Sequence, residues 1–393
     1  MSKNSLKIFR SFVRRATDPI YDLKRYLRRR AAAFWRRRFD DTIFIGITGS
    51  YGKTSATGLL GAMLEKAGPT KTSVFHNSAK RTIRAILRTL PGRYRYFVQE
   101  VSGDRPGAVA DTITFLQPTV GIVTTIGGDH RQNFRSLEAT AAEKSKLVHQ
   151  LPLDGLAVLN IGDPLVEKMG SGCRCMVVYY GRGENADLRL ISATSKWPAR
   201  LILEVEYRGE RFTVKSRLIG THWCVSVMAA LLAALELGVS RSACLEAIAT
   251  FEPVFNRLSV HNGPRDSTII LDAEKASNSS MEACLEFLGA ASASRKTAVI
   301  GTISDHPGAA RSHYHRCARI ALNGADRVFF TGKQAQRVRR LKDGEYADRL
   351  FIVESTRELH EQIARDAIPG ELIYIKASRA DQLHDLFVPR DQR

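Results

Sequence analysis

Short apolar runs, separated by longer stretches of helical periodicity, recur along most of the chain. In the first half, apolar runs typical of buried strands cover residues 42–47, 96–101, 120–125 and 156–160, with helical sequence at 54–66 and 136–150. Strands that alternate with helices in this way form a mostly parallel sheet covered by helices. The first half is therefore predicted to be an α/β domain.

The pattern changes near residue 186. Runs rich in β-formers at 188–191, 201–207 and 212–218 predict an antiparallel insertion, and a long helix is expected over 221–237. A second α/β cycle follows, with predicted strands at 268–271, 297–300, 327–330, 350–353 and 372–375. We therefore expect a leader at 1–38, a central domain with a mostly parallel sheet at 39–253, and a C-terminal Rossmann-like α/β domain at 254–393.

Composition narrows the class of protein. With 44% hydrophobic and 25% charged residues in 393, the chain is ordinary globular material. The closest cysteines, Cys173 and Cys175, lack the spacing of zinc knuckles, so reduced thiols are expected. The longest apolar stretch, 224–235, is too short to cross a bilayer, and no signal peptide follows the basic start. We therefore expect a cytoplasmic enzyme body.

Positive charge is concentrated at the N-terminus. Residues 1–38 hold thirteen Lys or Arg and two acids, which is +11 of the net charge of +19. Apolar residues interrupt this leader at roughly helical spacing, namely Leu6, Phe9, Phe12, Val13, Tyr21, Leu23, Leu27, Phe34 and Trp35. A basic amphipathic pattern fits an anionic membrane surface, a protein partner, or a solvated helix on the catalytic body. Nucleic acid is disfavoured, because no stacking or groove-reading pattern follows.

The strongest chemical signal is TGSYGKTS, between the first predicted strand and its helix. It comprises Thr48, Gly49, Ser50, Tyr51, Gly52, Lys53, Thr54 and Ser55. Glycines let backbone amides approach phosphate oxygens, Lys53 can reach the terminal phosphates of ATP, and Thr54 can bind Mg²⁺. The first glycine of the general phosphate loop is replaced by Ile47. The position after an apolar strand nevertheless favours a P-loop over a structural turn.

Two further predicted strands end in groups suited to metal chemistry. Glu100 ends one strand, and Asp129 and His130 follow another. Since ligands gather at the carboxyl ends of parallel strands, Thr54, Glu100 and His130 could share one Mg²⁺. Taken singly, Glu100 is more typical of a strand-capping acid and His130 of a surface histidine. Lys144, in the helix at 136–149, reads by itself as a solvated lysine paired with an acid.

Together these segments resemble a known family. TGSYGKTS, VQEVSGDRPGAVA, TTIGGDHRQNFRSLEATAAEKSKLV, GTHWCVSVMAA and FNRL, in this order, resemble the central domain of the Mur ligases. LDAEKASNSSMEACLEFL, AVIGTISD and LIYIKASR resemble the C-terminal domain of the branch that adds D-alanyl-D-alanine to a muramyl tripeptide. The resemblance covers roughly 42–385. It implies an ATP-dependent ligase that joins a carboxylate substrate to an amino acid or dipeptide amine through an acyl phosphate.

The resemblance also implies residue roles. Lys53, Lys144 and His130 would be catalytic, and Thr54, Glu100, His130 and Lys144 would hold Mg²⁺, Lys144 as the carbamate that many members carry. His222 and Arg257 would lie near the nucleotide and the interdomain hinge, and Asp272 would contact the ribose. Lys376, Ser378 and Arg379 would help to bind the amine.

The chain departs from the family where substrates are recognised. The family's N-terminal uridine-nucleotide domain has no counterpart in the basic leader. Trp223 replaces an asparagine, and Glu274, Lys275 and Asn278 replace the Tyr-Asn and Pro of a signature in the third domain. Two alternatives stay open. One is a ligase of the same class for a lipid-linked, peptide or secondary-metabolite acid, or for a polyglutamate-like chain. The other is a P-loop ATPase or binding protein that the leader recruits to membrane or nucleic acid without ligation.

Overall fold

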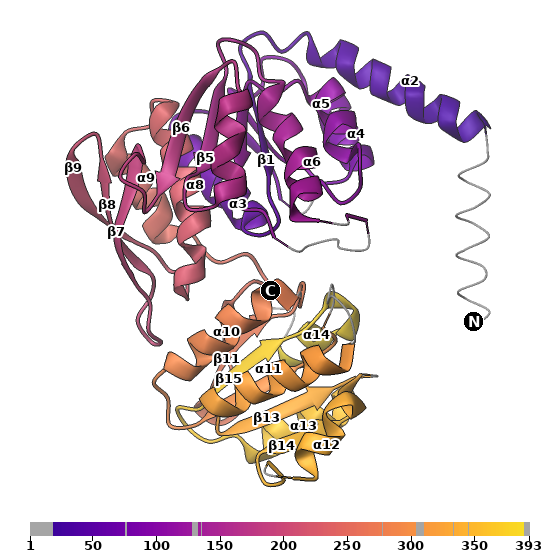
Figure 1. The fold of residues 1–393 in the computed structure, drawn as a ribbon, viewed down its shortest axis with the longest axis vertical. Coiled ribbons are helices and arrows are strands. Elements are labelled where there is room, and N and C mark those ends of the chain that lie inside the picture. The colour runs from indigo at the N-terminus through magenta and orange to yellow at the C-terminus, as the bar shows by residue number, and fades with distance from the viewer. Residues whose placement is uncertain are drawn as a thin grey trace.

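The computed structural model describes residues 19–388 apart from 75–76, 128–132, 135, 277, 304–309, 333 and 345. Two sheets organise this part of the chain, and each carries its own helices (Figure 1). The elements from α2 to α9 surround the first sheet, and those from β10 to α14 surround the second. The expected α/β class is confirmed.

The first sheet has the order β2-β3-β1-β4-β5-β6-β7-β8-β9. Its strands are β1 Ile43–Thr48, β2 Thr70–Ser73, β3 Tyr96–Glu100, β4 Val120–Val123, β5 Leu156–Asn160, β6 Met176–Gly181, β7 Leu188–Thr194, β8 Ile202–Tyr207 and β9 Glu210–Lys215. Neighbours from β2 to β7 are parallel, whereas β7, β8 and β9 pair antiparallel. The expected antiparallel strands are therefore an extension of the same sheet.

Helices cover both faces of this sheet. They are α2 Pro19–Arg36, α3 Lys53–Glu65, α4 Ala79–Leu87, α5 Ala108–Leu116, α6 Leu137–His149, α7 Pro164–Glu167, α8 Cys224–Glu236 and α9 Arg241–Thr250. Ile45 and Ile47 of β1 pack in one core with α3 and α8, while Phe44 packs in the other core with α4 and α5. This alternation follows from the two-residue period of a strand.

The second sheet has the order β10-β11-β15-β12-β13-β14, and only β10 runs antiparallel to its neighbour among the described strands. Its strands are β10 Ser259–Asn262, β11 Thr268–Asp272, β12 Lys296–Ile300, β13 Arg327–Thr331, β14 Leu350–Val353 and β15 Leu372–Lys376. The helices are α10 Asn278–Ala290, α11 Ala310–Gly324, α12 Arg339–Lys342, α13 Thr356–Asp366 and α14 Leu383–Phe387.

The segments between α2 and β1 and between α9 and β10 contain the expected boundaries near residues 38 and 253, which as domain limits stay predictions. Of the leader, residues 1–18 lie outside the described part, and α2 begins at Pro19. Within the described residues, no helix is both long and apolar enough to span a membrane.

Candidate active site

The loop between β1 and α3 has the backbone shape that a phosphate site needs. Gly49 has φ +147°, and a Cβ there would lie 1.9 Å from the Thr124 hydroxyl oxygen. Gly52 has φ +83° and directly precedes α3, which begins without a side-chain cap. The amides at the start of α3 are therefore available to an anion.

Hydrogen bonds to the segment after β4 and to α8 hold this loop in place. Ser50 N donates to Thr125 O at 2.8 Å, and the Thr124 hydroxyl donates to Tyr51 O at 2.6 Å. The Ser226 hydroxyl, on α8, donates to Gly52 O at 3.0 Å. Sequence reasoning missed these three supports, although Thr124 and Thr125 directly follow a strand, as Glu100 ends one. The loop is thus preorganised by hydrogen bonds to one of its amides and two of its carbonyls.

Two lysines converge on the loop. Lys53 Nζ donates to Gly49 O at 2.5 Å and to Ser50 O at 3.2 Å. Lys144 Nζ, from α6, donates to the same Gly49 O at 3.0 Å, and its side chain is 1% exposed. The interpretation of Lys144 as a solvated helix lysine is therefore wrong. The acid beside it, Glu143, instead accepts from the amides of Gly107 and Val109 at the start of α5.

Thr54 and Glu100 meet next to these lysines. The Thr54 hydroxyl donates to the two carboxylate oxygens of Glu100 at 3.2 and 3.3 Å, and both residues are buried. A hydroxyl beside a carboxylate is an oxygen donor set that suits Mg²⁺. Asp129 and His130 lie outside the described residues. The described part contains no group of three or more His, Cys, Asp or Glu residues arranged for a metal.

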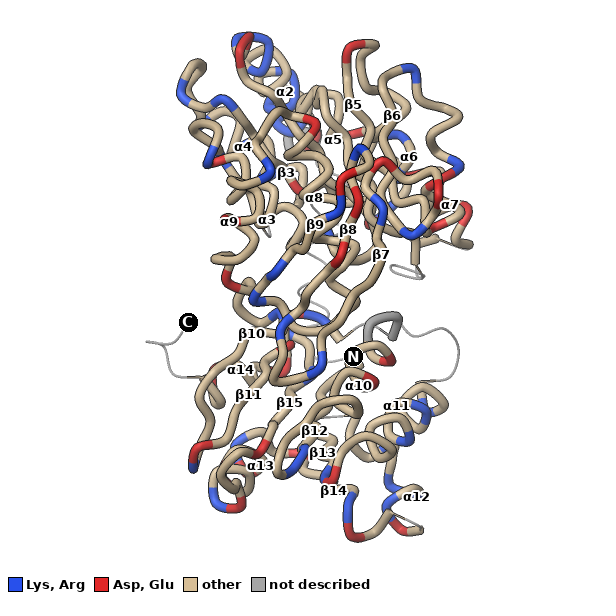
Figure 2. Tube along the Cα trace, turned by 90° about the vertical axis from the view of Figure 1, so that its left-hand side faces the viewer, with Lys and Arg blue, Asp and Glu red and all other residues tan. Residues whose placement is uncertain are grey.

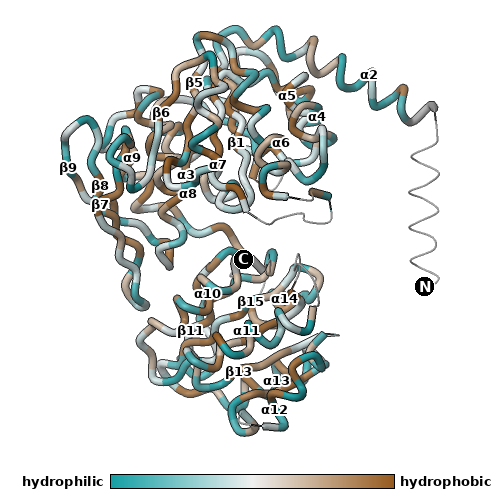
Figure 3. The backbone as a smooth tube through the Cα atoms, in the orientation of Figure 1, coloured by the Kyte–Doolittle hydropathy of each residue, from teal (hydrophilic) through white to brown (hydrophobic). Residues whose placement is uncertain are grey.

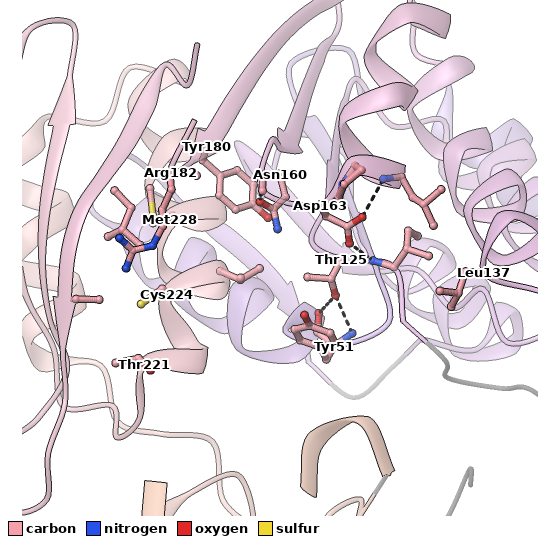
Figure 4. Close-up of a pocket in the computed structure, with 18 residues that line it drawn as sticks. Tyr51, Thr125, Leu137, Asn160, Asp163, Tyr180, Arg182, Thr221, Cys224 and Met228 are labelled. Atoms are coloured by element: carbon pink, nitrogen blue, oxygen red, sulfur yellow. Dashed lines mark hydrogen bonds between the residues drawn. The ribbon is translucent and has the colours of Figure 1, made fainter. Parts of the chain in front are cut away.

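A cavity of about 890 Å³ opens beside the loop, with Tyr51 in its wall (Figure 4). It lies at the carboxyl ends of β4, β5 and β6 and against the start of α8; its polar lining includes Thr125, Asn160, Asp163, Tyr180, Arg182 and Thr221. Asp163 accepts from Ile126 N at 2.7 Å and caps α7, so it shapes the wall. Apart from Tyr51, these residues were not expected from the sequence, although several follow predicted strands.

The second sheet contributes a buried ion pair at its carboxyl edge. Asp272 and Lys376 are register partners on β11 and β15, and the Lys376 ammonium donates to the Asp272 carboxylate. Burial opposes the charge of Lys376, but the attraction of Asp272 leaves its pKa raised. Arg257, between α9 and β10, lies close enough to Lys376 to oppose its charge. The structure thus brings together Asp272, Arg257 and Lys376.

His222 links this edge to the first sheet. It belongs to the short 3₁₀ turn Thr221–Trp223 before α8. Burial and the positive charge of Lys376 outweigh the attraction of Asp272 and lower the His222 pKa to about 4. The ring is therefore neutral at pH 7. Because Asp272 and Lys376 both act on the charge of His222, the ring lies within electrostatic reach of the carboxyl edge of the second sheet.

The residues that depart from the family occupy defined positions. Trp223 is buried, and its ring lies 5.1 Å from that of His222. Glu274 lies 3.7 Å from Arg379. Ser378 caps the following turn through Asp381. The side chain of Asn278 lies outside the described residues. Of the expected amine-binding residues, Lys376 is thus held by Asp272, and Arg379 is the most exposed.

Comparison with known proteins gives two domain matches. The Mur ligase middle domain matches residues 47–234, and the Mur ligase glutamate ligase domain matches 256–379. A UDP-N-acetylmuramoyl-tripeptide–D-alanyl-D-alanine ligase of Mycobacterium leprae is 26% identical over 86% of this chain and 71% of its own length. The corresponding ligase of Bacillus subtilis is 25% identical over 88% of this chain and 75% of its own length.

Solved structures agree in fold. MurF from Acinetobacter baumannii superposes with a TM-score of 0.83 and 22% identity, over 92% of this chain and 79% of that one. The MurF ligase of Thermotoga maritima in complex with ADP gives a TM-score of 0.76 and 21% identity, over 90% and 81%. With both domain matches in chain order and the phosphate loop formed, the chain belongs to the Mur ligase family of ATP-dependent carbon–nitrogen ligases.

Proposed function

We propose that this chain forms an amide bond between a carboxylate substrate and an amino acid or dipeptide amine at the expense of ATP. The observation that carries the proposal is the convergence of Lys53 and Lys144 on Gly49 O, beside the Thr54–Glu100 pair. Two cations at the start of a helix favour a polyphosphate. Glu100 places a carboxylate beside the two lysines, where it can bind the metal ion that accompanies a polyphosphate.

In the proposed first step, a carboxylate oxygen of the substrate attacks the γ-phosphorus of ATP, and the bond to the β-phosphate oxygen breaks. The products are an acyl phosphate and ADP. The amine nitrogen then attacks the acyl carbon, phosphate leaves with the bonding pair, and the nitrogen loses a proton. Lys53 would orient the γ-phosphate and neutralise the charge that develops on its oxygens.

The cavity beside Tyr51 is the proposed place of the nucleoside. Its volume of about 890 Å³ suits a ligand of this size, and it continues from the loop that would hold the phosphates. His222 and Asp272 would approach the same nucleotide from the junction of the two sheets, with Asp272 on the ribose. Closure of the second sheet over the first would bring the amine to the acyl phosphate.

Mg²⁺ fits the oxygen donors of the Thr54–Glu100 pair. We propose that Thr54 and Glu100 hold it together with His130, and that Lys144, converted to a carbamate by CO₂, holds a second ion. When bound, Mg²⁺ supplies positive charge that neutralises the phosphates. Carbamate formation would also remove one of the two ammonium groups that crowd Gly49 O.

The relatives' names identify muramyl peptides and D-alanyl-D-alanine as their substrates. For this chain we propose only the classes of the two substrates: a carboxylic acid, and an amino acid or dipeptide that supplies the amine. Glu274 and Lys275 stand in the third-domain signature, so selection of the amine is expected to differ from that of the relatives. We place the reaction in the cytoplasm, where ATP is available and the six cysteines would remain the thiols that they are here.

The test is a screen of carboxylate and amine pairs for ADP formation, with mass spectrometry of the products. A ligase releases ADP only with both substrates, or accumulates acyl phosphate with the acid alone. Steady hydrolysis of ATP that neither substrate changes would instead support the alternative of a P-loop ATPase. Binding of nucleic acid that stimulates this hydrolysis would support it further.

A further inference from the structure

The helix α2 is anchored on the first domain by one side only. Arg36 is 8% exposed and donates to the backbone oxygens of Leu116 and Gln117, each at 3.0 Å. Arg29 pairs with Asp111 of α5 at 2.8 Å. On the flank towards α4, Trp35 Nε1 donates to Thr89 O at 3.0 Å. The helix therefore lies across α4 and α5 and is held there by these polar contacts and by the buried Ala32.

The opposite side of α2 carries large apolar side chains. Leu23, Leu27 and Phe34 are 56%, 54% and 59% exposed. At about 100° per residue these three positions fall within about 40° of one another, on the side away from the buried Ala32 and Arg36. Tyr26, 52% exposed, borders the stripe. A surface helix normally turns such a stripe towards its own core. Here the stripe points away from the protein.

Positive charge surrounds this stripe. Lys24, Arg28 and Arg30 are exposed on α2, where polar and apolar positions alternate (Figure 3). The adjoining segment 80–95, which holds most of α4 and the loop after it, contains six Lys or Arg and no acid. Figure 2 shows the blue positions of α2 and α4 at the same end of the molecule. Leu87 and Leu90 of this segment are 40% and 61% exposed. We call residues 23–38 and 80–95 together the basic apolar surface.

We propose that the basic apolar surface docks on an anionic lipid bilayer. Leucine and phenylalanine at helical spacing can enter the boundary of headgroups and acyl chains, while the flanking cations meet anionic headgroups. A nucleic acid would use the cations but would leave the leucines in water, since phosphate contacts are polar. This inference concerns the first domain only and holds whether or not the proposed ligation is correct.

The position of the surface is compatible with catalysis on the membrane. Arg36 and Trp35 contact the segments that lead into β4 and β3, so the end of α2 lies at the amino ends of the strands. The phosphate loop follows the carboxyl end of β1, about 20 Å away along its six residues. A bilayer bound at α2 would therefore leave the phosphate loop open. Membrane binding and ATP binding should be separable.

The experiment is sedimentation of the full chain with vesicles of phosphatidylcholine, with and without phosphatidylserine. The unchanged protein should bind the phosphatidylserine vesicles, and more weakly at high salt. The triple variant Leu23→Glu, Leu27→Glu, Phe34→Glu should bind at least about tenfold more weakly. Its control is Leu153→Glu, because Leu153 is 74% exposed on a loop of the same domain and should not matter.

A second pair of variants tests the charge. Lys80→Gln, Arg81→Gln, Arg84→Gln should weaken binding to phosphatidylserine vesicles, whereas Arg339→Gln, Arg340→Gln on the exposed, basic α12 should not. Circular dichroism and ATP binding verify that each variant is folded. Equal binding by the triple glutamate variant would overturn the proposal. The proposal would also be overturned if the unchanged protein did not bind anionic vesicles, for example because it binds duplex DNA instead.

Discussion

Lys53 and Lys144 donate hydrogen bonds to one acceptor, the backbone oxygen of Gly49, although 91 positions separate them in the chain. Two ammonium groups that share one acceptor repel each other. An anion placed between them, or loss of one of the charges, would relieve the repulsion. The same geometry therefore gives reasons for phosphate binding and for carbamate formation.

Replacement of Lys53 by alanine should reduce ATP turnover by at least about a hundredfold, because Lys53 is expected to stabilise charge on the γ-phosphate. The variant should keep its circular dichroism spectrum, since the Lys53 side chain is partly exposed and donates to carbonyls of the loop. Lys66→Ala is the matched control. Lys66 follows α3 directly and forms an exposed pair with Glu246. A folded Lys53→Ala protein with full turnover would remove the phosphate-loop assignment.

Replacement of Lys144 by alanine should also lower turnover, and a short carboxylic acid such as acetate should partly restore it. The added carboxylate would occupy the space of the carbamate and supply its negative charge. Lys146→Ala, on the exposed side of the same helix, is the control. Turnover is measured with and without CO₂ and acetate. If neither Lys144→Ala nor removal of CO₂ changes turnover, Lys144 serves only to support the loop.

The site could be predicted from the sequence where residues with the right chemistry stand at the ends of predicted strands. TGSYGKTS and Glu100 come together because parallel strands end at one edge of a sheet. Lys144 lies on α6, and only the resemblance to the Mur ligases implied a role for it. The hydrogen bonds from Thr124 and Ser226 were not accessible, because a hydroxyl in a strand end or helix gives no sign of which carbonyl it meets. Burial of Lys144 was equally hidden, since the helix around it also contains exposed charges.

Most strands with apolar runs were predicted from the sequence, but β6, Met-Val-Val-Tyr-Tyr-Gly, was missed. The strand β2 was missed because its sequence, Thr-Lys-Thr-Ser, has no apolar residue and lies at the sheet edge. The leader was recognised as an amphipathic helix, but its inward side could not be known. Arg36 is turned inward because carbonyls accept its hydrogen bonds and its guanidinium lies 3.7 Å from the Phe44 ring centre. Burial lowers the Arg36 pKa to about 10, yet the residue stays charged at pH 7.

Replacement of Glu100 by glutamine should raise the Mg²⁺ concentration needed for half-maximal ATP turnover, by about tenfold or more. The amide keeps the hydrogen bond to Thr54 but loses the charge that attracts a hard cation. Glu167→Gln, an exposed acid on α7, is the control for a change of one charge. Turnover is titrated with Mg²⁺ at fixed ATP. An unchanged midpoint would leave Glu100 as a strand-capping acid.

Stability should fall as the pH drops from about 6.5 to about 4, with His222 as one cause. The His222 pKa is about 4 in the folded chain, whereas an unfolded histidine titrates near 6.5. Between these values the unfolded state binds more protons, so the free energy of unfolding rises with pH. The contribution is at most about 3 kcal/mol, because a difference of one in pKa is worth about 1.4 kcal/mol. Urea unfolding at pH 4.5 and 7.5 measures the difference in stability.

His222→Gln cannot titrate and should reduce this difference, whatever the substitution does to stability at pH 7.5. An equal difference in the two proteins would mean that His222 is not desolvated at the junction of the two sheets, and the nucleotide-side role proposed for it would lose its structural basis.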